Sequence, residues 1–183
     1  MKPIRVVPIG IVERPLLDAV AAALSAEYRV PCSVTPATID PTNTRHPERG
    51  QYHSTELLDR LASMQLPTRA LGVAAVDLYI PILTFVFGEA HLAGDCAIVS
   101  YHRLEESFYG LPRNAAITKT RLIKGAIHEI GHTYGLVHCD DYECVMAATH
   151  SVEWLDLKGS ALCEECRRQM ALGDTTRADA TAR

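Results

Sequence analysis

The sequence contains no long apolar run and no cluster of basic residues. The apolar part of residues 1–7 (MKPIRVV) is too short and too rich in β-branched side chains for a signal peptide or a membrane span. The 18 Lys and Arg residues give no phosphate-binding footprint, and the formal net charge is −4 at pH 7. We therefore expect a cytoplasmic protein that binds neither membranes nor nucleic acid.

Internal repeats and interdomain linkers are also missing from the sequence. A chain of 183 residues fits one domain, and a domain of this size buries roughly 70% of its unfolded surface without needing disulfides. Its 48% hydrophobic and 22% charged residues are typical of a globular protein. We expect a single domain over residues 1–172 and a frayed or disordered tail over 173–183, where no core-facing pattern remains.

The six cysteines occur without a secretory signal, so reduced thiols or metal ligands are expected rather than disulfides. Cys32 and Cys96 have no partner at the spacing of metal ligands. Each is therefore expected to be a small hydrophobic core residue.

Two kinds of apolar spacing alternate along the chain. Apolar and β-branched runs predict strands at residues 4–12, 30–34, 70–76, 83–88 and 96–101. Helical spacing predicts helices at 15–26, from an N-cap at Ser54 to Met64, from an N-cap at Thr118 through the central motif, and at 164–172. Pro31 places the second strand at an edge or at a strand start. The polar segment 36–53 predicts a long loop, which either flanks a cleft or is a solvated connection.

The central motif is HEIGHTYGLVH, at residues 128–138. His128 and His132 are four residues apart, so on a helix both imidazoles can reach one metal ion from the same face. Glu129 projects beside that ion, where its carboxylate can deprotonate a metal-bound water without being a ligand. Gly135 can take the left-handed conformation that ends a helix, which allows His138 to return to the ion. Three nitrogen ligands leave a fourth position for water, as in catalytic zinc sites.

The five-residue HExxH pattern also occurs by chance on amphipathic helices, where both histidines are merely solvated. Here Gly135 and His138 extend the pattern to HExxHxxGxxH, the metzincin form of the zinc protease motif. The longer match favours a hydrolytic zinc site over a chance pattern.

A second group of candidate ligands follows directly. It consists of Cys139, Cys144, Cys163 and Cys166. Two close pairs separated by a longer loop are typical of a closed, structural zinc site, which would link the loop after the central helix to the C-terminal helix. The alternatives are a redox pair at Cys163 and Cys166, four unrelated buried thiols, and a four-cysteine iron–sulfur cluster.

The line HEIGHTYGLVHCDDYECVM, followed later by CEEC, resembles the archaemetzincins, a branch of the metzincin zinc-dependent proteases. Their pattern is HExxHxxGxxHC, four residues, CxM and a later CxxC, and every element is present here. The resemblance is strongest over residues 118–166. Weaker similarity at residues 78–81 and 85–88 extends it over most of the chain before the tail.

The resemblance implies an α/β (α+β), metzincin-like fold: a mixed, twisted sheet of about five strands with an active-site zinc helix and flanking helices. It implies two zinc ions per chain. The ligands of the catalytic zinc would be His128, His132 and His138, and the general base would be Glu129. The ligands of the structural zinc would be Cys139, Cys144, Cys163 and Cys166. Gly135 and Met146 would be supporting residues, and Met146 would lie in the turn under the catalytic zinc. The position of a metal-bound tyrosine in some metzincins is Ala148 here, so no tyrosine ligand is expected.

The function that follows is hydrolysis of peptide bonds in a peptide or protein substrate, by a zinc-activated water with a glutamate base. By analogy with metzincins, an extended peptide would pair with an edge strand, for which residues 97–101 are the candidate. The alternative is a zinc-stabilised peptide- or protein-binding protein whose histidine site is weakly metallated and not catalytic. A zinc-ribbon adaptor that uses only the cysteines is a further rival, but it leaves the three histidines unexplained.

Overall fold

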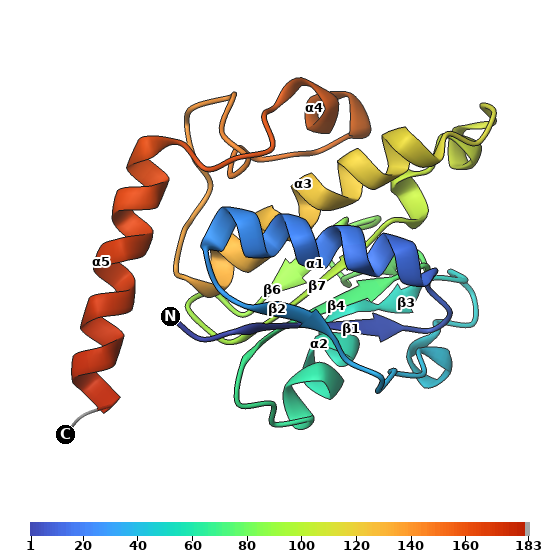
Figure 1. Cartoon of the computed structure of the whole chain (residues 1–183). Coiled ribbons are helices and arrows are strands. Elements are labelled where there is room, and N and C mark those ends of the chain that lie inside the picture. Colours follow the sequence, from blue (N-terminus) through green and yellow to red (C-terminus); the bar gives the residue numbers. More distant parts are fainter. Residues whose placement is uncertain (182–183) are drawn as a thin grey trace.

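A five-stranded sheet forms the middle layer of this computed structural model (Figure 1). In spatial order its strands are β2 (Cys32–Val34), β1 (Ile4–Ile9), β4 (Arg69–Ala74), β7 (Cys96–Ser100) and β6 (Gly88–Ala90). The first four run parallel to one another, and β6 runs antiparallel to β7. The predicted mixed sheet is confirmed, and β2 lies at an edge, as Pro31 indicates. The structure describes the backbone of residues 1–181 and the side chains of residues 1–172.

Helices cover both faces of this sheet. α1 (Arg14–Tyr28) and α3 (Ala115–Thr133) pack on one face, and α2 (Ser54–Ser63) packs on the other (Figure 1). Consecutive residues of β1 alternate between the two layers, because Val6 joins the core with α1 and α3 whereas Val7 joins the core with α2. A sheet covered on both faces needs two apolar faces, which explains why β1 has a nearly continuous apolar sequence.

Shorter elements complete the fold. They are the parallel pair β3 (Tyr52–His53) and β5 (Leu78–Tyr79), the 3₁₀ turns η1 (Thr42–Thr44), η2 (His102–Leu104) and η3 (Glu106–Tyr109), and the helices α4 (Val152–Leu157) and α5 (Glu164–Thr181). Segment 36–53 is irregular apart from η1 and β3, as predicted for a long loop. α5 stands at the side of the sheet and its helices (Figure 1).

The predicted strand at 83–88 is wrong for most of its length. Residues 83–87 form bends and one isolated bridge, between Val86 and Leu78, and β6 begins only at Gly88. The apolar side chains that indicated a strand instead line a cleft. The predicted edge strand at 97–101 is also wrong, because β7 lies between β4 and β6 and the antiparallel β6 is the edge.

Two helix caps differ from the predictions, and one helix is additional. Asn114 rather than Thr118 caps α3, because its side-chain oxygen accepts hydrogen bonds from two backbone N–H groups of the first turn, both at 3.2 Å. His53 rather than Ser54 caps α2, since its Nδ1 accepts a first-turn N–H at 3.3 Å. The helix α4 is too short to show a helical period in the sequence.

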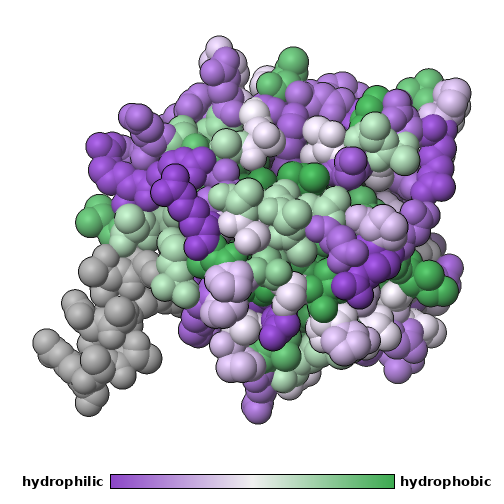
Figure 2. All heavy atoms as spheres, in the orientation of Figure 1, coloured by the Kyte–Doolittle hydropathy of each residue, from purple (hydrophilic) through white to green (hydrophobic). Residues whose placement is uncertain are grey.

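On the face shown in Figure 2, hydrophilic and hydrophobic residues are interspersed, as is usual when most large apolar side chains lie in the core. Within the described part of the chain, no helix combines the length and the apolar character that crossing a membrane requires. The division into a domain of residues 1–172 and a tail of 173–183 stays a prediction, and residues 182–183 lie outside the described residues.

Candidate metal centres

Two histidines lie one turn apart near the end of α3. The Nε2 atoms of His128 and His132 are 3.1 Å apart. α3 ends at Thr133, and Gly135 has a φ of +91°, a left-handed conformation that favours a residue without Cβ. The chain then brings back His138, whose ring centroid lies 5.3 Å from each of the other two. One nitrogen from each of the three rings lies within 4.8 Å of the others.

Hydrogen bonds on the outer side of two rings fix their orientation. Nδ1 of His128 lies 2.9 Å from the carbonyl oxygen of Val145, and Nδ1 of His132 lies 2.7 Å from that of Leu136. When each Nδ1 donates its proton to the carbonyl, the Nε2 lone pairs face the common centre. Burial lowers the pKa of all three imidazoles, and the nearby Lys158 ammonium lowers them further. Three neutral imidazoles with converging nitrogens fit a zinc ion.

Glu129 is buried beside the histidines, with 8% of its surface exposed. β6 packs closely against it, because a Cβ on Gly88 would lie 2.7 Å from both Cγ and Cδ of Glu129. Burial raises the pKa of the Glu129 carboxyl to about 8; the Lys158 ammonium opposes this rise and the Glu89 carboxylate adds to it. The structure thus brings a buried carboxyl group to the edge of the histidine centre.

Met146 lies behind the ligand-bearing end of α3 and is fully buried. A Cβ on Gly131 would come within 2.5 Å of the Met146 Sδ, so helix and methionine approach this closely only because residue 131 has no side chain. The Met146 carbonyl accepts the backbone N–H of Cys139 at 3.0 Å. Met146 therefore connects the end of α3 to the loop that carries the third histidine.

The three histidines and Glu129 line a cleft with a volume of about 680 Å³. Its walls are mainly apolar and include Leu83, Phe85, Phe87, Leu92 and Val137; His150 also lines it. The long loop 36–53 does not line the cleft but supports its wall, because Arg49 donates hydrogen bonds at 2.9 Å to the carbonyl oxygens of Leu83 and Thr84.

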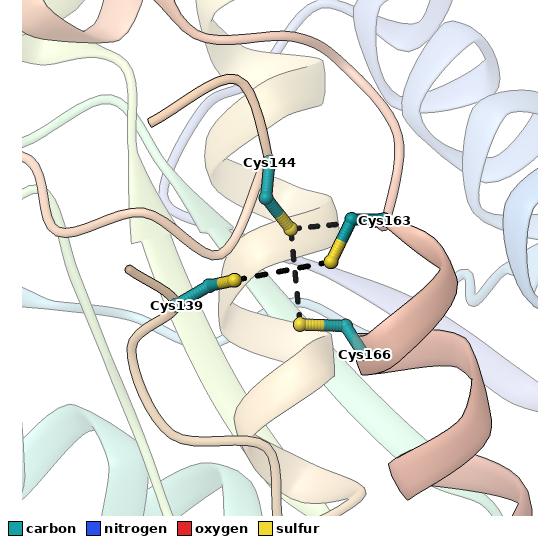
Figure 3. A group of neighbouring side chains, drawn as sticks. All are labelled: Cys139, Cys144, Cys163 and Cys166. Atoms are coloured by element: carbon teal, nitrogen blue, oxygen red, sulfur yellow. Dashed lines mark hydrogen bonds between the residues drawn. The ribbon is translucent and has the colours of Figure 1, made fainter. Parts of the chain in front are cut away.

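The four cysteine side chains converge on one point, from two loops and the N-terminal turn of α5 (Figure 3). The sulfur atoms of Cys139 and Cys163 are 3.8 Å apart, and so are those of Cys144 and Cys166. All four sulfurs lie within 4.8 Å of one another. The structure thus brings together all four predicted ligands of the second site.

These separations suit a single zinc ion. A tetrahedron with zinc–sulfur bonds of about 2.3 Å has edges of about 3.8 Å. An iron–sulfur cluster would hold the sulfurs further apart, because several iron and sulfide atoms lie between the thiolates. The short distances also place Cys163 next to Cys139 and Cys166 next to Cys144. This arrangement disfavours an isolated redox pair formed by Cys163 and Cys166. Cys32 and Cys96 lie outside both groups, half-buried in β2 and β7.

Lys158 is a buried residue that the sequence analysis does not single out. Only 4% of its surface is exposed, and its Nζ donates to the carbonyl oxygens of Val145 at 2.7 Å and Ala147 at 3.0 Å. Burial lowers the pKa of Lys158 to about 8, whereas Glu129 and Cys144 act in the opposite direction. Because lysine is not an apolar residue, the hydrophobic pattern of the sequence does not indicate that Lys158 is buried. The only sequence feature that could have pointed to Lys158 is its position between the CxM and CxxC motifs.

Comparison with known proteins gives consistent matches over most of the chain. The model of a family described as peptidase family M54 matches residues 35–171. The archaemetzincin of Methanocaldococcus jannaschii is 38% identical over 163 residues, which cover 89% of each chain. A zinc-dependent peptidase from Methanocorpusculum labreanum is 32% identical, with a TM-score of 0.84 over 91% of this chain and 99% of its own. The archaemetzincin of Archaeoglobus fulgidus, crystallised with malonate, is 32% identical with a TM-score of 0.78 over the same shares.

The region matched by the family model contains both the central histidine motif and the cysteine motif, which are the basis of the resemblance seen in the sequence. The solved relatives also share the arrangement of sheet and helices over nearly their whole length. Agreement of this extent, in sequence and in fold, shows that the chain belongs to peptidase family M54, the archaemetzincin family of zinc metallopeptidases.

Proposed function

We propose that the chain hydrolyses peptide bonds in the cleft, with zinc held by His128, His132 and His138 and with Glu129 as the general base. The main support is the convergence of three imidazole nitrogens beside a buried carboxyl group in the wall of an open cleft. A purely structural site requires neither the open cleft nor the carboxyl group.

Zinc bound there would supply Lewis acidity, which lowers the pKa of a water molecule and polarises the substrate carbonyl. Glu129 would take the proton of the attacking water on a carboxylate oxygen and pass it to the nitrogen of the leaving amine. A divalent cation beside Glu129 favours the ionised carboxylate and so opposes the effect of burial. The Nδ1 hydrogen bonds of His128 and His132 would keep both rings oriented during turnover.

We propose further that the substrate is an extended peptide that pairs with β6 rather than with β7. β6 is the last strand of the described sheet and carries Gly88, which packs on Glu129. An edge strand offers backbone N–H and C=O groups to an added strand. The mainly apolar walls of the cleft favour apolar side chains next to the cleaved bond.

The second part of the proposal is a structural zinc ion bound by Cys139, Cys144, Cys163 and Cys166. Its support is the tetrahedral fit of the sulfur separations. All six cysteines are free thiols in the structure, which suits a reducing compartment such as the cytoplasm. There, four converging thiolates can bind zinc without competing disulfide formation.

The decisive test compares the zinc content of wild type and Glu129→Gln with their cleavage of a mixed-sequence peptide library. We expect two zinc ions per chain in both, and a loss of cleavage of about 10²–10⁴-fold in the variant, because only the proton acceptor is changed. Glu56→Gln is the matched control, since Glu56 is an exposed acid on α2, on the other face of the sheet. Cleavage at the wild-type rate by zinc-loaded Glu129→Gln would refute the mechanism. A wild type that binds peptides without cutting them would support the binding-protein alternative.

A further inference from the structure

The ammonium group of Lys158 lies on the outer side of the histidine centre. Its Nζ is 3.4 Å from Nδ1 of His128, whereas the metal-facing nitrogen of that ring is Nε2. Among the residues whose side chains are described, Lys158 forms no ion pair. Two of its hydrogen bonds go instead to the backbone carbonyls on either side of Met146. A buried cation whose close partners are two carbonyl oxygens and an imidazole nitrogen is costly and calls for a specific explanation.

The Val145 carbonyl has two donors. It accepts from Lys158 Nζ at 2.7 Å and faces Nδ1 of His128 at 2.9 Å. The position of this oxygen sets the plane of the His128 ring and the direction of its Nε2 lone pair. A charged donor makes a stronger hydrogen bond than a neutral one, so Lys158 holds the oxygen more firmly than a neutral side chain would.

Lys158 is itself held by the helix that carries the ligands. The Nζ of Lys124 on α3 donates to the carbonyl oxygens of Leu155 at 2.9 Å, Asp156 at 3.1 Å and Lys158 at 2.6 Å, at the C-terminal end of α4. Lys124 precedes His128 by one helical turn. The backbone of Lys158 therefore has a fixed position relative to His128.

The segment that carries Lys158 also pairs with the loop that carries Cys144. The backbone N–H of Gly159 donates to the Glu143 carbonyl at 2.8 Å, and that of Val145 donates to the Ala161 carbonyl at 3.0 Å. A Cβ on Gly159 would lie 2.6 Å from the Glu143 oxygen, so this close approach needs glycine. Four thiolates carry more negative charge than one divalent ion neutralises, and the Lys158 ammonium beside Cys144 partly offsets that excess.

We propose that Lys158 is a positioning residue shared by the two metal centres, and that its ammonium group, by fixing the Val145 carbonyl, holds the His128 imidazole in its metal-binding orientation. The inference rests on the proposed function only in taking His128 as a zinc ligand. Lys158 also lines the cleft, but its proposed contribution is to the affinity and rigidity of the histidine centre.

The test measures zinc affinity at each centre of the full-length, zinc-loaded chain, by competition with chelators of graded strength. Cobalt substitution distinguishes the centres, because cobalt–thiolate absorption reports only the cysteines. We expect Lys158→Met to weaken zinc binding at the histidine centre by about 10–100-fold, the usual effect of removing a group that orients a metal ligand. Zinc at the cysteine centre should stay bound, and Lys158→Arg, which keeps the charge and the donors, should recover most of the affinity.

Lys119→Met is the matched control, because Lys119 is an exposed lysine on the same helix. It should leave both affinities unchanged. A lower thermal stability of Lys158→Met with wild-type affinity at the histidine centre would show a merely structural lysine and overturn the proposal. Binding is measured without substrate, so a wild type that binds zinc at the histidines but cleaves no peptide would refute the proposed function alone.

If Lys158→Met does not fold, the test passes to Lys124→Met. That variant leaves Lys158 in place but removes the three hydrogen bonds from α3 that fix its backbone. We expect a smaller loss of affinity at the histidine centre, of about 3–10-fold, below the roughly 10–100-fold that is usual for a group in direct contact with a metal ligand. Wild-type affinity in folded Lys124→Met would overturn the proposal.

Discussion

The histidine centre and the cysteine centre meet at adjacent residues, His138 and Cys139, yet they are enclosed very differently. The histidines run from the buried His128 to the exposed His138, and all three line the cleft. Cys144 and Cys166 are buried, and none of the four cysteines is among the residues that line the cleft. Access to a cavity, rather than the identity of the ion, is therefore the feature that would separate a catalytic zinc site from a structural one in this chain.

The two centres also differ in the length of the chain segment that their ligands enclose. The histidine centre is formed by one helix end and a short return, residues 128–138. The cysteine centre joins residues 139–144 to residues 163–166, and the chain between them contains Met146, α4 and Lys158. Loss of the cysteine centre should therefore disturb the histidine centre, and the reverse effect should be small.

The largest effect is expected from Cys166→Ser. Removing a buried thiolate ligand should release zinc from the cysteine centre and lower the free energy of unfolding by on the order of 5 kcal/mol, because structural zinc contributes directly to folding. Zinc at the histidine centre should then bind more weakly, since Cys139 no longer anchors the loop after His138. Urea unfolding and zinc content measure both changes.

His138→Ala is the matching change in the other centre. It should lose only the histidine-bound zinc and change stability by less than about 1 kcal/mol, because His138 is exposed. Equal losses of stability in the two variants would contradict the proposed asymmetry.

A change confined to the catalytic side is Gly88→Ala. The new Cβ would lie 2.6 Å from the Ile98 carbonyl oxygen and 2.7 Å from Glu129, so either β6 or the carboxylate must move. We expect peptide cleavage to fall by about 10–100-fold, because small misplacements of a catalytic group are costly. Both zinc ions should remain bound. Wild-type kinetics in the zinc-loaded variant would show that the position of Glu129 does not depend on β6.

Gly131→Ala tests the contact between α3 and Met146 that lies behind the histidine centre. Alanine favours a helix by about 1 kcal/mol over glycine, but its Cβ would come within 2.5 Å of the buried Met146 Sδ. We expect the clash to dominate, with a net loss of about 1–3 kcal/mol in urea unfolding. Gly125→Ala on the same helix is the control: its Cβ would lie 3.0 Å from Val99 Cγ2, so the loss should be smaller. A stabilised Gly131→Ala would show that Met146 can move aside.

The sequence predicts both groups of candidate metal ligands that the structure brings together, because their spacing encodes local geometry. One helical turn is enough to place His128 and His132 on the same face of α3. The left-handed conformation of Gly135 reverses the chain and brings His138 back to the other two histidines. The cysteine pairs likewise follow a ligand spacing that is independent of the rest of the fold. Strands β1, β2, β4 and β7 also follow from apolar runs, because the strands of a sheet covered on both faces carry apolar side chains on both sides.

Features that depend on tertiary contacts are not predictable in this way. The apolar residues 83–87 have the composition of a strand, but they line a cleft whose opposite wall comes from distant segments. The order of β7 and β6 depends on pairing across the sheet, which a single sequence does not reveal. The Lys158 ammonium is stabilised in the interior by hydrogen bonds to the backbone carbonyl groups of Val145 and Ala147. Because every residue has a backbone carbonyl, the sequence does not reveal these contacts.

The smallest expected effect separates the four clustered cysteines from the two outside them. Burial raises the pKa of the Cys32 thiol from 9.0 to about 11 and also raises the pKa of Cys96. At pH 8 a rise of two pKa units leaves about 100-fold less thiolate on Cys32, and the thiolate is the species that alkylates. Alkylation at pH 8, read by mass spectrometry, should therefore label neither residue readily. Once a chelator removes zinc, the partly exposed Cys139 and Cys163 should be labelled more rapidly than in the zinc-loaded protein.

Raising the pH should sharpen this contrast. Since the pKa of Cys32 lies above the range tested, its labelling should accelerate about tenfold per pH unit from pH 8 to pH 10, without the plateau that a thiol of pKa 9.0 begins to show there. The zinc-bound cysteines should not follow this slope, because their thiolates are held by the metal rather than by a proton. Labelling of Cys139 or Cys163 that rises with pH like that of Cys32, in zinc-loaded protein, would mean that the cysteine centre binds no metal.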